Sequence, residues 1–162
     1  MKSCLVAVCL LAATVALGQN QPPPAPADLD DGVSGMYTFL KEGEFVEVDL
    51  EEKVHISGFV SRYGDSDSDR GAFLDHMIDK GEFDRPNMHW ITKPIHGVWF
   101  EFKGRVERGE AKSPNLEGYR VLKGTLTEYN TDENKKTSAR SREVTFKSFP
   151  QDVMANPARK KD

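Results

Sequence analysis

The segment from 95 to 106, IHGVWFEFKGRV, alternates apolar and polar side chains. A period of two is the pattern of a β-strand that buries one face and leaves the other in water, and an α-helix cannot bury such a row. This period recurs along most of the chain and constrains the fold more than any other feature. The row that we expect to face the core contains His96, Val98, Phe100, Phe102 and Val106.

Further segments carry the same strand signal, and most are joined by short connections. They are 35–40, 44–50, 53–61, 87–93, 118–129 and 142–149. Short connections suit antiparallel neighbours, because parallel strands require long crossovers. Single glycines interrupt several of these strands, as bulges and bends of a strongly curved sheet require. We therefore predict a mainly β fold, an antiparallel meander of about seven to eight strands that forms a small barrel.

One segment departs from this period after the third strand. Its apolar residues are Phe73, Leu74, Met77 and Ile78. This spacing places them on one stripe of an α-helix that ends before a glycine. The serines and aspartates that precede the stripe are residues that cap the free N–H groups of a helix and complement its dipole. We therefore predict one short helix over residues 69–80.

The start of the chain predicts export. Residues 1–18 combine a lysine, an apolar run and small residues at a cleavage point, which are the features of a signal peptide. No apolar run reaches the roughly 20 residues that span a bilayer, so we predict no membrane span. We expect the mature protein in the periplasm or the extracellular space. The rest divides into a proline-rich disordered linker at 19–33, a single domain at 34–150 and a disordered tail at 151–162.

Composition excludes several kinds of chemistry. Both cysteines, Cys4 and Cys9, lie in the predicted signal peptide, so the mature chain has no disulfide and no thiol chemistry. The net charge of −4 argues against a nucleic-acid partner. The sequence contains no G-x-S-x-G elbow, H-E-x-x-H motif, phosphate loop or dinucleotide fingerprint. We therefore expect a protein that is not an enzyme.

The segment GDSDSDRG places carboxylates at alternate positions, Asp65, Asp67 and Asp69, as the first half of a calcium loop does. The turn glycine and the final glutamate of such a loop are replaced by Arg70 and His76. Aspartates that cap a helix, or that lie in a solvated surface loop, would produce the same pattern. The segment therefore leaves two interpretations open, a surface loop and a site for calcium or another metal.

Candidate residues for a ligand site come from the strand alternation. His96 shares the inward row, so it is either bonded to a backbone carbonyl or orients a ligand in an apolar cavity. Aromatic residues that could line the same cavity are Tyr37, Phe100 and Phe102. Trp99 lies on the outward face, where it is either covered by the predicted helix or exposed as a recognition residue.

Two tripeptides resemble lipocalin motifs. GMY at 35–37 is similar to the G-x-W of lipocalins, and TEY at 127–129 is similar to their T-D-Y. Arg140 or Arg142 stands in the position of the closing arginine. Tyrosine replaces the family's tryptophan, and glutamate replaces its aspartate. The resemblance implies a lipocalin-like barrel that binds a ligand.

Three functions are consistent with these observations. The first is an exported binding module that holds a small apolar ligand in its barrel. The second is a non-enzymatic structural or interaction protein of the cell envelope, with a filled barrel and an envelope protein as its partner. The third is a calcium- or metal-dependent protein that uses the loop from Asp65 to Asp69.

Overall fold

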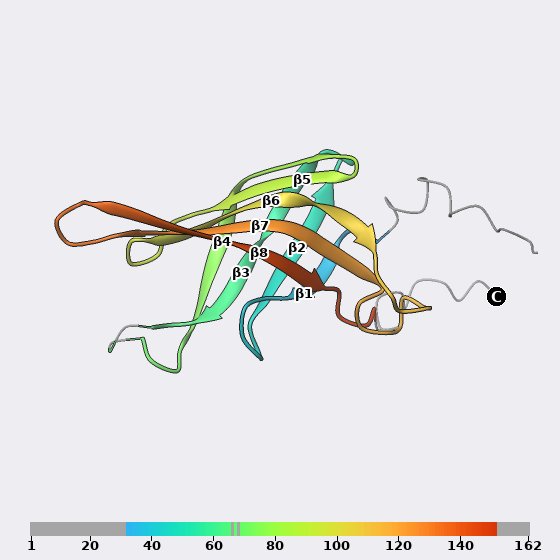
Figure 1. Ribbon diagram of the computed structural model, residues 1–162, viewed down its shortest axis with the longest axis horizontal. Coiled ribbons are helices and arrows are strands. Elements are labelled where there is room, and N and C mark those ends of the chain that lie inside the picture. The colour runs from blue at the N-terminus through green and yellow to red at the C-terminus, as the bar shows by residue number, and fades with distance from the viewer. Residues whose placement is uncertain (1–31, 66, 68, 152–162) are drawn as a thin grey trace, which may run out of the picture.

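The computed structural model describes residues 32–65, 67 and 69–151, and it folds as one eight-stranded antiparallel sheet (Figure 1). Each strand pairs with the strand before it, so the predicted meander is confirmed. The strands are β1 (Gly35–Thr38), β2 (Phe45–Glu51), β3 (His55–Tyr63), β4 (Phe73–Asp84), β5 (Asn87–Thr92), β6 (Val98–Arg108), β7 (Arg120–Thr131) and β8 (Thr137–Lys147).

The predicted signal peptide, residues 1–18, lies outside the described residues. So do nearly all of the predicted linker, 19–33, and of the predicted tail, 151–162. Within the described residues, no helix has the length and apolar character needed to cross a membrane.

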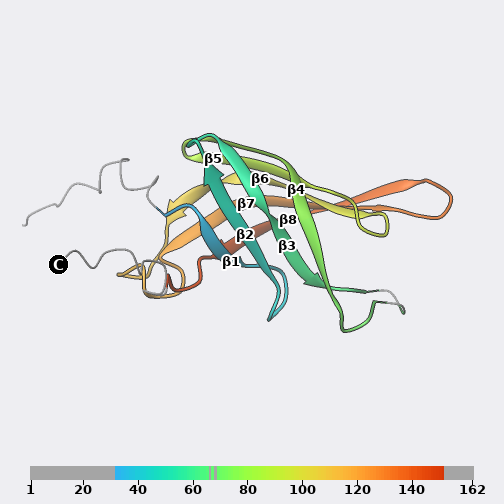
Figure 2. The ribbon, with the colours of Figure 1, turned by 180° about the vertical axis from the view of Figure 1, so that it is seen from behind.

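The sheet curls into a half-barrel whose first and last strands meet near the end of β8. Tyr37 of β1 forms an antiparallel bridge with Ser148, just after β8. The backbone N–H of Phe149 donates to the carbonyl oxygen of Met36 over 2.8 Å. At the other end the β3–β4 and β7–β8 hairpins point apart, as both views show (Figures 1 and 2).

Aromatic side chains fill the centre of the half-barrel. The ring of Trp90 on β5 stacks on Phe102 of β6 with 5.4 Å between centroids. Phe146 of β8 lies 5.9 Å from Phe102 and 5.2 Å from Phe39. Each buried aromatic side chain removes about 150–250 Å² from water, so this cluster is a main source of stability. The core residues are Val33, Tyr37, Phe39, Val46, Val48, Ile56, Val60, Phe83, Met88, Trp90, Phe100, Phe102, Val106, Leu122, Leu126 and Phe146.

The predicted helix over 69–80 is wrong, because Phe73–Asp84 is the strand β4. The segment also fits a period of two, with Leu74, His76 and Ile78 less exposed than Phe73 and Met77. Pairing decides between the two patterns. The backbone of β4 pairs with β3 on one side and β5 on the other. A helix here would leave both neighbouring strands with unpaired backbone groups, which costs free energy where water is excluded.

Gly58 provides a test of the close packing between strands. Its φ is 128°, and a Cβ there would lie 2.1 Å from the carbonyl oxygen of Glu47. The register of β3 against β4 shifts beside it, between His55 and Phe59. We expect Gly58→Ala to lower the free energy of unfolding by about 2 kcal/mol or more, because backbone strain adds to a steric clash.

Chemical denaturation measures this change, and Gly71→Ala is the matched control. Gly71 also has a positive φ, 85°, but a Cβ added there would have no neighbouring atom within 4 Å. The control therefore carries only the cost of the backbone conformation, about 1 kcal/mol. Equal losses in the two variants would show that close strand approach at Gly58 is unimportant.

Candidate functional site

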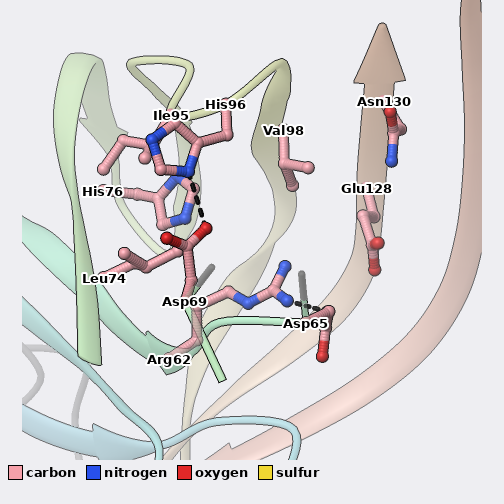
Figure 3. Close-up of a pocket in the computed structure, with 10 residues that line it drawn as sticks. All are labelled: Arg62, Asp65, Asp69, Leu74, His76, Ile95, His96, Val98, Glu128 and Asn130. Atoms are coloured by element: carbon pink, nitrogen blue, oxygen red, sulfur yellow. Dashed lines mark hydrogen bonds and ion pairs between the residues drawn. The ribbon is translucent and has the colours of Figure 1, made fainter. Parts of the chain in front are cut away.

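A pocket of about 300 Å³ opens where the hairpins point apart (Figure 3). We call it the mouth pocket. It lies on the concave side, where β4, β6 and β7 converge with the β3–β4 and β5–β6 connections. Its lining residues are Arg62, Asp65, Asp69, Leu74, His76, Ile95, His96, Val98, Glu128 and Asn130.

His76 forms one wall of the mouth pocket and is fully buried. It points inward from β4, opposite Val60 of β3, and its ring meets the ring of Phe100 edge to face at 5.2 Å. Neither ring nitrogen has a hydrogen-bond partner among the described residues. A buried polar group without a partner costs about 1–3 kcal/mol, so a group that supplies the missing bond would be bound favourably.

Burial lowers the pKa of His76 below its ordinary value. The backbone of Lys93 opposes this shift, although it does not complete a hydrogen bond, and the positive charge of Arg62 adds to it. His76 is therefore neutral at pH 7. A neutral imidazole has one nitrogen that donates and one that accepts, so it matches a ligand group such as a hydroxyl.

Charged side chains at the rim of the mouth pocket are joined in ion pairs. Arg62, whose side chain is 8 % exposed, pairs with Asp65. Glu128 of β7 accepts a hydrogen bond from Arg142 of β8 over 3.0 Å. Because these charges already have partners, the mouth pocket offers little to a ligand of either sign. Its apolar walls are Leu74, Ile95 and Val98.

His96 does not continue the inward row of β6, and that expectation is wrong. The strand begins at Val98, and His96 lies in the turn before it with a φ of 49°. His96 and Gly97, which both have a positive φ, form a two-residue hairpin turn that is closed by two backbone hydrogen bonds between Ile95 and Val98. The side chain is 63 % exposed and its Nδ1 lies 2.8 Å from a carboxylate oxygen of Asp69. His96 nevertheless lines the mouth pocket beside His76 (Figure 3).

The acidic segment connects β3 to β4 and does not cap a helix. The structure gives each aspartate a different basic side chain as its partner. Asp65 pairs with Arg62 and with Lys41 at 3.3 Å, Asp67 pairs with Arg70 at 2.6 Å, and Asp69 pairs with His96. Within the described ranges, no three histidine, cysteine, aspartate or glutamate side chains are grouped so that they could hold a metal ion.

The aromatic candidates do not line the mouth pocket, although Phe100 packs directly behind its wall against His76. Phe100 and Phe102 are fully buried in the filled core. Tyr37 is also buried, and its hydroxyl donates to the carbonyl oxygen of Val33 over 2.6 Å. Of the residues that the sequence nominated for a small ligand, the structure places His96 at the mouth pocket.

Trp99 lies on the outer face, with no helix over it among the described residues. Its ring stacks on Tyr129 of β7 with 5.0 Å between centroids and 7° between planes. The Tyr129 hydroxyl donates to Glu101 over 2.7 Å, and Glu101 also contacts His89 and Lys103. This cluster joins β5, β6 and β7 on the side away from the core.

No protein-family model and no curated protein matches this chain. The class that the fold defines is an eight-stranded antiparallel half-barrel, and no family match identifies it as a lipocalin.

Sequence reasoning missed His76 because its segment was predicted as a helix. On the helical stripe His76 stands beside the apolar residues rather than among them. With a period of two, it falls between Leu74 and Ile78 on the inward face. An inward histidine in a strand near a barrel end was therefore the signal present in the sequence.

The pKa of His76 predicts a dependence of stability on pH. A histidine whose pKa is lowered by folding takes up a proton more readily in the unfolded state, so the free energy of unfolding decreases as the pH falls below about 6.5. In His76→Phe this contribution is absent, and we expect a smaller decrease over the same range. Denaturant unfolding at several pH values measures both slopes; identical slopes would contradict a neutral, buried His76.

The lowered pKa of Glu101 predicts that stability also depends on pH in a more acidic range. Burial raises its pKa, but hydrogen bonds from Lys103, Tyr129 and His89 outweigh burial and lower the pKa from 4.5 to about 2. This carboxylate therefore stabilises the fold above pH 4.5 and loses that contribution as the pH falls toward 2. We expect Glu101→Gln to lower the free energy of unfolding by about 1–2 kcal/mol at neutral pH. The variant should also lose less stability than the unaltered protein as the pH falls from 4.5 toward 2. Denaturant unfolding at several pH values measures this change, and an equal loss of stability at low pH in both proteins would rule out this role for Glu101.

Proposed function

We propose that this protein is an exported binding module that holds a small ligand in the mouth pocket. The proposal rests on His76, a fully buried side chain on the pocket wall. Its two ring nitrogens have no hydrogen-bond partner within the described structure. Pockets that bind small molecules combine apolar walls with a few polar groups that fix orientation. Export of the mature chain, to the periplasm or the extracellular space, is part of the proposal and is supported by the sequence of residues 1–18.

The chemistry of the mouth pocket favours a neutral ligand with an apolar body and one hydroxyl or carbonyl group. Leu74, Ile95 and Val98 would contact the body, and His76 would bond the polar group. A charged head group would have to separate an existing ion pair or lie in the mouth pocket without a partner, and either change would weaken its binding. The volume of about 300 Å³ is at the small end of the range for ligand pockets.

This proposal modifies two expectations about the ligand. The histidine that orients it is His76, while His96 is the exposed neighbour at the rim of the mouth pocket. The site is at the open end of the half-barrel rather than in its aromatic centre. The lipocalin-like tripeptides and the curled meander support a carrier of this general kind.

Ligand binding can be measured by thermal unfolding with decanol, decanoate and decane as probes. A ligand that binds the folded state raises the unfolding midpoint. We expect decanol to raise it most, because decane has no group for His76 and decanoate brings a charge. His76→Phe should abolish the advantage of decanol over decane, since the substitution keeps the ring and removes its polar atoms.

His96→Ala is the matched control for this experiment. It removes the other imidazole of the mouth pocket, and we expect decanol binding to be retained. Loss of binding in His96→Ala with retention in His76→Phe would assign the ligand to His96 instead. If none of the three probes shifts the midpoint of the unaltered protein, the proposal of a small apolar ligand with a neutral head group is wrong.

A further inference from the structure

The outer faces of β1 to β4 carry a band of large apolar side chains, which we call the outer apolar face. They alternate along the strands with buried residues, so they point away from the core. Register places Phe59 opposite Met77, and Tyr63 opposite Phe73. The members are Met36, Phe45, Phe59, Tyr63, Phe73 and Met77.

Ring contacts join neighbouring strands at two places on this face, on either side of the hydrogen-bonded pair Ser61 and Asp75. Phe45 and Phe59 lie 5.8 Å apart, and Tyr63 and Phe73 lie 4.4 Å apart. Met36, Phe73 and Met77 are 40 %, 49 % and 50 % exposed. Single exposed apolar residues are ordinary, but a contiguous group rimmed by polar residues marks an interaction site.

Carboxylates lie within and beside the outer apolar face, and several have no cationic partner. Glu47 lies opposite Met36 and Phe59, with Asp49 further along β2. Glu82 projects from the same side of β4, opposite His55. In the described part of the chain, no lysine or arginine forms an ion pair with Glu47, Asp49 or Glu82. The carboxylates of the mouth pocket, in contrast, are paired.

We propose that the outer apolar face binds a basic amphipathic segment of a partner protein. Apolar side chains of such a segment would contact the methionines and aromatic rings, and its lysines and arginines would reach the unpaired carboxylates. The rings of Tyr63 and Phe73 also offer faces to cations. Methionine is a flexible side chain that adapts to varied apolar partners.

The negative charge of the outer apolar face distinguishes among the partners that could cover it. A second copy of this chain would place Glu47, Asp49 and Glu82 against the same carboxylates, and like charges at an interface cost several kcal/mol. An anionic membrane surface would be repelled for the same reason. A cationic amphipathic segment can contact the apolar side chains and form ion pairs with the carboxylates.

The proposal is tested with a fluorescent synthetic peptide of alternating lysine and leucine, by anisotropy on the full mature chain. Oligolysine and a glutamate–leucine peptide serve as reference probes. We expect the lysine–leucine peptide to bind at least about tenfold more tightly than either reference, a difference of about 1.4 kcal/mol. The double variant Phe73→Ser with Met77→Ser should remove most of this advantage, and Glu47→Gln with Asp49→Asn should weaken binding and reduce its dependence on salt.

Leu116→Ser is the matched control, because Leu116 is an exposed apolar residue, 53 % accessible, that lies in the β6–β7 connection and is not a member of the outer apolar face. It should bind the peptide as the unaltered chain does. Thermal unfolding confirms that each variant is folded. Equal binding of oligolysine and the lysine–leucine peptide would show attraction by charge alone and overturn the proposal. So would an unchanged affinity in the Phe73→Ser, Met77→Ser variant, or concentration-dependent dimerisation that this variant abolishes.

The outer apolar face and the mouth pocket are on opposite sides of the sheet, so their tests are independent. Substitution of His76 should leave peptide binding unchanged, and substitution of Phe73 and Met77 should leave decanol binding unchanged.

Discussion

The half-barrel depends on aromatic packing in which Phe39, after the first strand, contacts Phe100 of β6 and Phe146 of β8. Trp90, Phe102 and Phe146 come from β5, β6 and β8, and Phe39, which follows β1, packs against the last of these rings. Because the rings meet across the concave side, they hold the two ends of the sheet toward each other. Hydrogen bonds between neighbouring strands would be equally satisfied in a flatter sheet, so this packing determines the curvature.

The same inward rows change character along the strands, and this change creates the mouth pocket. On β3 the row runs from Ile56 through Val60 to Arg62, and on β7 it runs from Leu126 to Glu128. Apolar side chains close the centre, and the charged side chains at the diverging end are joined in ion pairs. The site is therefore produced by the continuation of the strands beyond the core, together with the β3–β4 and β5–β6 connections.

Much of the fold was accessible from the sequence because a period of two is a local property. The strand 95–106 and its neighbours showed which side chains enter the core, and Phe100, Phe102, Leu122 and Leu126 are all buried. The segment 73–84 was not accessible in this way, because its apolar spacing fits a helix as well as a strand. Only pairing with β3 and β5, a long-range property, decides between them.

The candidate site was harder to predict than the fold for a related reason. The polarity of His96 was evident, but its position depends on a turn of a few residues that moves it out of the strand. His76 became visible as a site residue only once β4 was known to be a strand. The ion pairs that connect Arg62 and Asp65, or Glu128 and Arg142, depend on side-chain placement that strand periodicity does not specify.

The meeting of β1 and β8 over a few residues has a consequence for behaviour in concentrated solution. Most of β8 pairs only with β7 among the described strands, so its other edge presents free backbone donors and acceptors. Such an edge is a template for aggregation between chains unless it is protected. Arg140, Arg142 and Glu143 stand along this edge, and two edges brought together in antiparallel register would confront charges of the same sign near the middle. The charges that give this strand little part in the core thus guard the protein against growth into fibres.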